Sequence, residues 1–108
     1  MPGTTIARGN ILVDTLIGPT LTPVSVGGST AAEQSFTVLG LQTGDMVSIT
    51  ANVAQTAGIG IGNARVSAAN TLTVEFTNST AGALTPVAGQ YLITVMRPEN
   101  TPLPTNAV

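Results

Sequence analysis

Polar and apolar residues alternate with a period of two along several short stretches of the chain, as they do in half-buried β-strands. The clearest stretch is 72–77, where Leu72, Val74 and Phe76 would share one face and polar residues the other. The same alternation marks residues 35–39, 46–52, 63–67 and 90–97. No window carries the apolar stripe of a helix, and its best candidate, 53–57, is too short to form a stable one. The pattern therefore predicts an all-β fold.

Turn-forming residues separate these predicted strands at short intervals. Turns are expected at 40–45, in the glycine-rich stretch 56–62, and at 68–70, where Asn70 can adopt a positive φ. Short strands with turns between them favour an antiparallel β-sandwich, here of a jelly-roll-like type. Its core would be formed by Phe36, Val38, Val47, Ile49, Leu72, Val74, Phe76, Tyr91, Ile93 and Val95.

Proline and glycine divide the chain into three parts. Residues 1–33 are predicted to form an extended N-terminal arm with short edge strands, and residues 34–97 the β-sandwich core. Within the arm, 11–13 and 16–17 are each apolar enough for a short strand. Pro19 and Pro23 cannot donate to a ladder, so a strand near them is expected to be an edge strand or to end there. Residues 98–108 are predicted to form an extended, Pro-rich C-terminal tail.

Charge is scarce, at 7% of residues against about 25% in an ordinary soluble domain. The net charge is −2, and Arg8, Arg65 and Arg97 are the only cationic side chains. Nucleic-acid binding needs clustered cations, and anionic membranes attract them, so neither partner is expected. With so little charge, the protein either relies on a neutral Thr-rich surface or buries part of its surface against partners.

The side chains that carry most enzymatic chemistry are missing, since the chain contains no His, Cys or Lys. Its acids are dispersed along the sequence: Asp14, Glu33, Asp45, Glu75 and Glu99. The glycines of 58–62 have the wrong spacing for a dinucleotide-binding loop, and a strand is expected to follow them instead of a helix. We therefore predict no catalytic, metal or cofactor-binding residue, and a protein that is not an enzyme.

Apolar residues in flexible segments are the candidates for contact with partner proteins. The arm supplies Ile11, Leu12, Val13, Leu16 and Ile17, and the tail supplies Leu103. Ile59 and Ile61 lie in the glycine-rich stretch, where they either contact a partner or fold back onto the edge of the sandwich. Extended segments of this kind can add a strand to a neighbouring sheet.

Three segments resemble small structural proteins of tailed bacteriophages. They are GLQTGD at 40–45, GIGIGNARVSAANTL at 58–72 and LTPVAGQY at 84–91. The resemblance is to head decoration, or cement, proteins. It implies a virion protein, made in the bacterial host cytoplasm, that binds the outside of the capsid and stabilises the shell. The partners implied are the major capsid protein and copies of the chain itself, in a homo-oligomer such as a dimer or trimer.

Two other functions remain open on the sequence. One is a phage tail, fibre or baseplate module. The other is a carbohydrate-binding or adhesin-like β domain, which would normally present exposed Trp or Tyr side chains for stacking on sugars. Tyr91 is the single candidate for that role, and the alternation of its strand places it on the apolar face.

Overall fold

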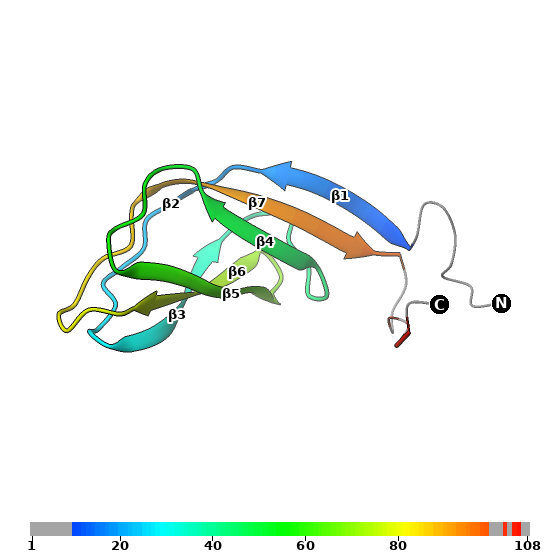
Figure 1. The fold of residues 1–108 in the computed structure, drawn as a ribbon. Helices are drawn as coiled ribbons and strands as arrows, with labels where there is room; N and C mark the ends of the chain where they lie inside the picture. The colour runs from blue at the N-terminus through cyan, green and yellow to red at the C-terminus, as the bar shows by residue number, and fades with distance from the viewer. Residues whose placement is uncertain (1–9, 100–102, 104, 107–108) are drawn as a thin grey trace.

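The chain forms two packed antiparallel sheets in the computed structural model, which describes residues 10–99, 103 and 105–106 (Figure 1). The strands are β1 (Ile11–Ile17), β2 (Thr20–Leu21), β3 (Thr30–Thr37), β4 (Met46–Ala51), β5 (Ile59–Ala68), β6 (Thr71–Asn78) and β7 (Gly89–Pro98). No helix occurs among the described residues, and hence none that is long and apolar enough to cross a membrane. The predicted all-β, antiparallel class is confirmed.

Strand β7 is the centre of the first sheet. It pairs with β1 and β2, and β4 also pairs with it. Between β1 and β2 the chain stays beside β7, because the Pro19 carbonyl accepts a hydrogen bond from the Tyr91 amide at 2.9 Å. The prediction of two separate short strands at 11–13 and 16–17 is therefore wrong: they form one continuous strand, since their backbone pairs with β7 from Ile11 to Ile17.

Strand β6 is the centre of the second sheet, between β3 and β5. A tight turn joins β5 to β6, and Asn70 has the positive φ expected of it, 60°. The glycine-rich stretch 56–62 was expected to be a loop, but β5 already begins at Ile59. The Ile59 and Ile61 side chains pack against the core, and burying them favours a strand over a loop.

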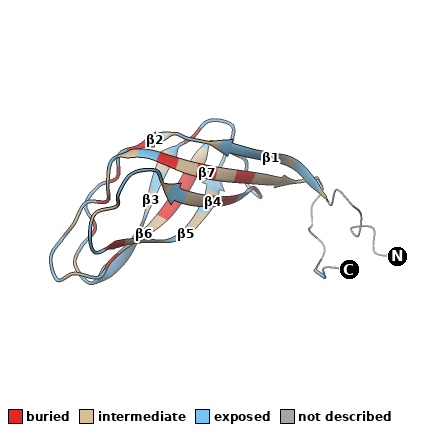
Figure 2. Ribbon diagram, turned by 45° about the horizontal axis from the view of Figure 1, so that its top comes forward, coloured by how far each residue is buried: buried red, intermediate tan, exposed pale blue. Residues whose placement is uncertain are grey.

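The core lies between the sheets and is mainly aliphatic. In Figure 2 the buried positions follow the two central strands, β6 and β7. Phe76 and Tyr91 pack edge to face, with ring centroids 6.5 Å apart. The predicted core residues are buried except Phe36 and Ile49, which are half-buried. The residues of the hydrophobic core that the alternation did not identify are Leu21, Val26, Leu41 and Ile59.

Asn78 fastens the end of β6 to two loops and is itself buried. Its amide nitrogen donates to the carbonyls of Val26, at 3.0 Å, and Gly82, at 2.9 Å. Its side-chain oxygen accepts hydrogen bonds from the amide and hydroxyl of Thr80. Asn78 also begins an Asn-Ser-Thr glycosylation motif, but in this fold its nitrogen is enclosed and already bonded.

Replacing Asn78 by Ala is expected to lower the free energy of unfolding by about 1–3 kcal/mol, because it removes the hydrogen bonds by which this buried side chain ties β6 to the two loops. Chemical denaturation followed by circular dichroism measures the change. Asn63→Ala is the matched control, because the Asn63 side chain is exposed on β5. Equal losses in the two variants would contradict the role given to Asn78.

Candidate interaction surface

Exposed apolar side chains gather on β1, at the edge of the first sheet. Leu12 and Leu16 are 63% and 65% exposed, and Ile11 is 38% exposed. Among the described strands β1 pairs with β7 alone, so its other edge presents backbone groups that no strand covers. Figure 2 shows this strand as mostly exposed. An edge that is both apolar and unpaired is suited to adding a strand from another chain.

A hollow of about 200 Å³ lies beside β1 on its inner side. It is lined by Val13, Thr15, Ile17, Leu39, Gly40, Leu41, Val95 and Arg97. Leu39 is 81% exposed, the most exposed of the large apolar side chains described. A strand added to the free edge of β1 would lie next to this hollow and place its own inward side chains against it.

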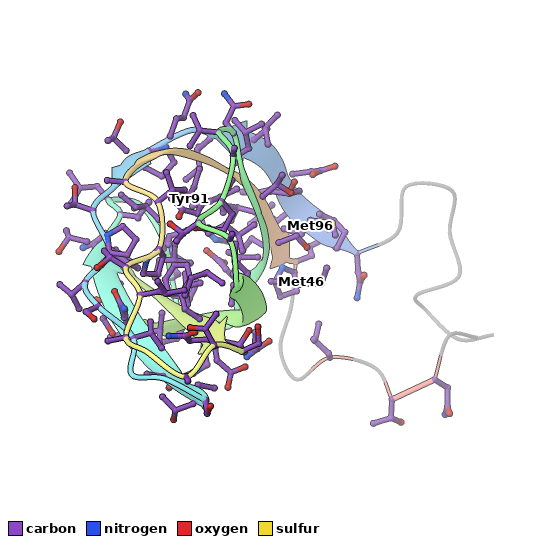
Figure 3. The ribbon with its side chains drawn as sticks, turned by 60° about the vertical axis from the view of Figure 1, so that its left-hand side comes forward. Met46, Tyr91 and Met96 are labelled. Carbon is purple, nitrogen blue, oxygen red and sulfur yellow. The ribbon has the colours of Figure 1, made fainter. Side chains whose placement is uncertain are left out.

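The outer face of the first sheet continues this apolar surface onto the neighbouring strands. Met46 on β4 lies opposite Met96 on β7 (Figure 3). On the other side of β7, Asp14 of β1 lies opposite Met96. Met46 is 57% exposed. Asp14 is the one charged residue of β1 and lies at its centre, where Thr15 is the only other residue that is not apolar.

The predicted contact residues separate into groups. Ile11, Leu12 and Leu16 are exposed together on β1, whereas Val13 and Ile17 are half-buried and line the hollow. Ile59 is buried, and Ile61 is half-buried beside a second hollow between β4 and β5, so both fold back onto the sheets. Leu103 is exposed, in the tail.

Two exposed apolar residues of this surface were not found from the sequence. Leu39 was assigned to the alternating stretch 35–39, but β3 ends at Thr37, and Leu39 lies in the turn that follows. Met46 was correctly placed in a strand, on the face opposite the core residues Val47 and Ile49, but it was not named as a contact residue. A large apolar residue directly before a glycine turn, as in Leu39–Gly40, is the available signal.

Asp45 and Arg97 form an ion pair that ties the 40–45 turn to β7. Arg97 Nε donates to Asp45 Oδ1 at 2.8 Å, and its Nη2 donates to Oδ2 at 2.9 Å and to the Gly40 carbonyl. The Asp45 side chain is 1% exposed. The hydrogen bond from Arg97 lowers the pKa of Asp45, burial opposes that effect, and the Gln42 amide lowers the pKa further. The pair is thus an internal clamp, beside a hollow of about 310 Å³ that Leu12 also lines.

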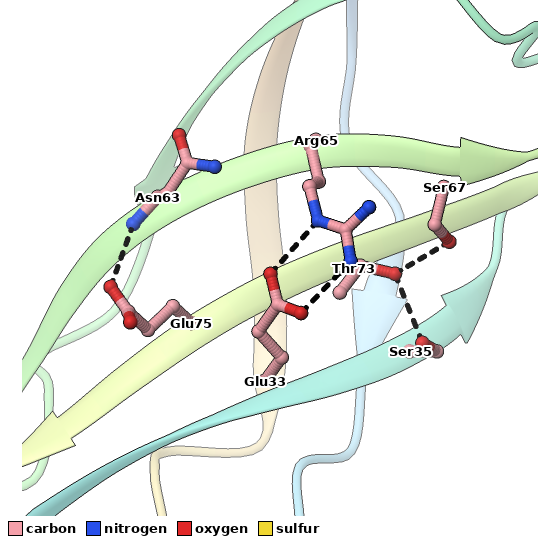
Figure 4. A network of polar contacts seen from close by, with 7 residues as sticks. All are labelled: Glu33, Ser35, Asn63, Arg65, Ser67, Thr73 and Glu75. Atoms are coloured by element: carbon pink, nitrogen blue, oxygen red, sulfur yellow. Dashed lines mark hydrogen bonds and ion pairs between the residues drawn. The ribbon is translucent and has the colours of Figure 1, made fainter.

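The outer face of the second sheet carries a polar network (Figure 4). Arg65 on β5 makes two hydrogen bonds to Glu33 on β3, each 2.9 Å, across the central strand. Thr73 on that strand hydrogen-bonds to Ser35 and Ser67 and is buried beneath the network. These contacts join the three strands to one another, and they lower the pKa of Glu33 through its hydrogen bonds with Arg65.

The described acids do not assemble into a catalytic or metal-binding group. Asp45 and Glu33 are each engaged by an arginine, and Glu75 accepts a hydrogen bond from the Asn63 amide at 3.4 Å. In the part of the chain that the structure describes, no three His, Cys, Asp or Glu residues lie close enough together to hold a metal ion. The surface with the most distinctive chemistry is therefore the apolar edge at β1.

A scan against models of protein families matched nothing, and searches of curated proteins and of solved structures found no similar chain. The function is accordingly argued from the chain's own residues and surfaces.

Proposed function

We propose that this chain is a non-enzymatic structural protein of a bacteriophage particle, which binds the outside of the capsid and stabilises the shell. The observation that carries the proposal is the free, apolar edge of β1, with Leu12 and Leu16 exposed beside it. A protein that reinforces a shell needs surfaces that hold other proteins and needs no catalytic group. The resemblance of its turns to head decoration proteins supports the same role.

The binding energy would come from backbone and side chains together. The free backbone edge of β1 would pair with a strand of a neighbouring copy of the chain, which supplies main-chain hydrogen bonds. The exposed Leu12 and Leu16 side chains would contact the major capsid protein, and each buried apolar side chain adds roughly 1.5–3 kcal/mol. Many copies on one shell make modest single contacts effective through multivalency. The protein would be made in the bacterial cytoplasm and reside on the virion.

The order of strand pairing supports a jelly-roll-like sandwich. β1 and β2, from the N-terminal side, pair with β7, and β3 pairs with β6, so pairing proceeds from the ends of the chain inward. β4 and β5 then pair with β7 and β6 in turn. The β1–β7 and β3–β6 pairs are those that a long antiparallel ribbon rolled up on itself, as in jelly rolls, produces, whereas β5 and β6 form a local hairpin.

The alternatives differ in what they need from the surface. Carbohydrate binding through aromatic stacking is disfavoured, because Phe76 and Tyr91 are fully buried and Phe36 is half-buried. A tail, fibre or baseplate module would use the same apolar edge on a different part of the particle. Imaging of particles therefore has to separate head from tail.

The test uses capsids assembled from the major capsid protein encoded near this chain's gene. Purified chain is added, unbound protein is removed by sedimentation, and bound particles are imaged by electron cryomicroscopy. We expect added density on the outer capsid surface. Density on the tail alone, or no binding, would overturn the proposal.

A pair of variants tests the β1 edge in the same assay. Changing Leu12 and Leu16 together to Asp is expected to weaken capsid binding at least tenfold, because both side chains would carry charge into the contact. The control is Val24→Asp, since Val24 is equally exposed but lies against Gln34 of β3, in the second sheet. Equal binding by both variants would show that β1 is not the capsid contact.

A further inference from the structure

The sequence of β1 reads almost the same in both directions. Around Asp14, its residues run Ile-Leu-Val-Asp-Thr-Leu-Ile. The flanking positions therefore match in pairs: Ile11 with Ile17, Leu12 with Leu16, and Val13 with Thr15, which share a branched shape. In a two-fold symmetric contact each residue meets its counterpart on the other copy, so a palindromic edge strand is self-complementary.

We propose that two copies of the chain associate by pairing their β1 strands antiparallel, about a two-fold axis that passes beside Asp14. This deepens the self-association of the proposed function, on which it rests, by naming the strand and the symmetry. In that register Asp14 lies opposite the partner's Asp14, and Leu16 lies opposite the partner's Leu12. The two first sheets become one continuous sheet.

The backbone of β1 has the phase that this register requires. On β7, the Tyr91 amide bonds toward the β1–β2 side, and the Gln90 carbonyl accepts from Asn52 on the β4 side. Successive residues of a strand direct their backbone groups to opposite edges, so the odd-numbered residues of β7 direct theirs toward β1. Val13, Thr15 and Ile17 lie opposite these residues, and their own amides and carbonyls therefore point to β7. Asp14 and Leu16 therefore direct their amides and carbonyls to the free edge, and Asp14 can exchange a pair of hydrogen bonds with its symmetry mate.

The contact would also cover the hollow beside β1. Val13 and Thr15 line it from one side, and the partner's Thr15 and Val13 would lie directly opposite them, extending the inner face. The bulge at Leu12, between Ile11 and Val13, lies at the end of the paired stretch. Leu12 also lines the hollow beside Arg97, so it remains close to the inner side.

The other edges of the described sheets are less suited to this pairing. The side chain of Gln34 on β3 holds both backbone groups of Val24, at 2.8 and 2.7 Å, so a loop already lies against that edge. β5 carries two irregularities in its register, which disturb regular pairing. β4 presents Ser48 and Thr50 on its exposed face, whereas β1 presents leucines.

Asp14 sets the strength of the contact. Two carboxylates directly opposite one another repel, so the charge at the centre of the palindrome weakens an otherwise matched pairing. Asp14→Asn is expected to tighten the dimer about 2–5-fold, as measured by analytical ultracentrifugation of the full chain. Weaker or unchanged association in Asp14→Asn would contradict the register.

Because the chain contains no Cys, a single introduced Cys can form a disulfide only with the same Cys of another copy. Asp14→Cys places two thiols on residues whose Cα atoms are about 5.5 Å apart, within the range of a disulfide. Leu16→Cys places the two thiols on residues that lie four positions apart along the paired strands. Their Cα atoms are about 13 Å apart, which is too far for a disulfide. Thr50→Cys, exposed on β4, measures random collision. In a glutathione redox buffer, with no capsid present, we expect a covalent dimer from the first variant alone.

Leu16→Pro provides an independent disruption. The Leu16 amide points to the free edge, so the proline removes a donor from the dimer without removing one from the pairing with β7. Association is expected to weaken at least tenfold while the circular dichroism spectrum is unchanged. Equal cross-linking at positions 14 and 16, or none at 14, overturns the inference. Cross-linking at 14 without capsid binding instead preserves the dimer and overturns the capsid role.

Discussion

Replacing Phe76 by Ala should lower the free energy of unfolding by about 3–5 kcal/mol, a large part of the stability of a domain of this size. Phe76 is fully buried between the sheets and packs edge to face on Tyr91. Its removal leaves a cavity next to the other large ring, and the two sheets cannot close on it without moving both central strands. Urea denaturation monitored by circular dichroism measures the loss.

The matched control is Phe36→Ala, because Phe36 is the same residue type on the flanking strand β3 but is half-buried. A smaller loss is expected there, since part of its ring is already in water. If the two variants were destabilised equally, the core would not be centred on β6 and β7.

Replacing Asp45 by Asn is expected to lower the melting temperature by roughly 10 °C or more at pH 7. Asn keeps the size of the side chain but leaves Arg97 without its counter-charge in a partly enclosed position. The 40–45 turn would also lose the charge-assisted bonds that hold it against β7. Thermal unfolding followed by circular dichroism measures this effect.

The pH dependence of stability provides a second measurement on Asp45. The hydrogen bond from Arg97 lowers the pKa of Asp45 in the folded state, so this interaction stabilises the protein above the unfolded-state pKa, near 4. The stabilisation is lost as the pH falls from about 5 through the lowered pKa of the folded state. Asp45→Asn should therefore flatten the decline in stability below pH 5.

Glu33→Gln is the control for both measurements. The carboxylate of Glu33 also pairs with an arginine, and the hydrogen bond from Arg65 lowers its pKa. Both side chains of this pair, however, are well exposed to solvent. Solvent weakens such a pair, so its removal should leave the melting temperature close to that of the unaltered chain. A larger loss in Glu33→Gln than in Asp45→Asn would contradict the role of burial.

Strands with strict alternation could be predicted from the sequence. The stretch 72–77 became β6, and 90–97 became β7, because each central strand buries one whole face and so carries a continuous apolar set. The positive φ of Asn70 was likewise predictable, since few residues tolerate that conformation. Local chemistry decided these features.

Features set by distant contacts could not be predicted. Leu41 lies in a turn and Val26 in a short bridge to Leu84, yet both are buried, because loops from far along the chain fold over the ends of the sheets. The glycine-rich stretch became part of β5 because β6 offered it a partner. The sequence did supply the apolar residues of the candidate surface at β1, but their free edge follows only from the pairing.

The dependence of the first sheet on β7 also determines when this protein can fold. β1, β2 and β4 all require one strand near the far end of the described chain, with Ile11 pairing with Pro98. During synthesis these three strands are therefore made early and wait without a partner until β7 has left the ribosome. Such non-local pairing is slow, on the order of milliseconds to seconds, even once the whole chain is present. In that interval the apolar strand β1 is accessible on both edges, and chaperones have the opportunity to bind it.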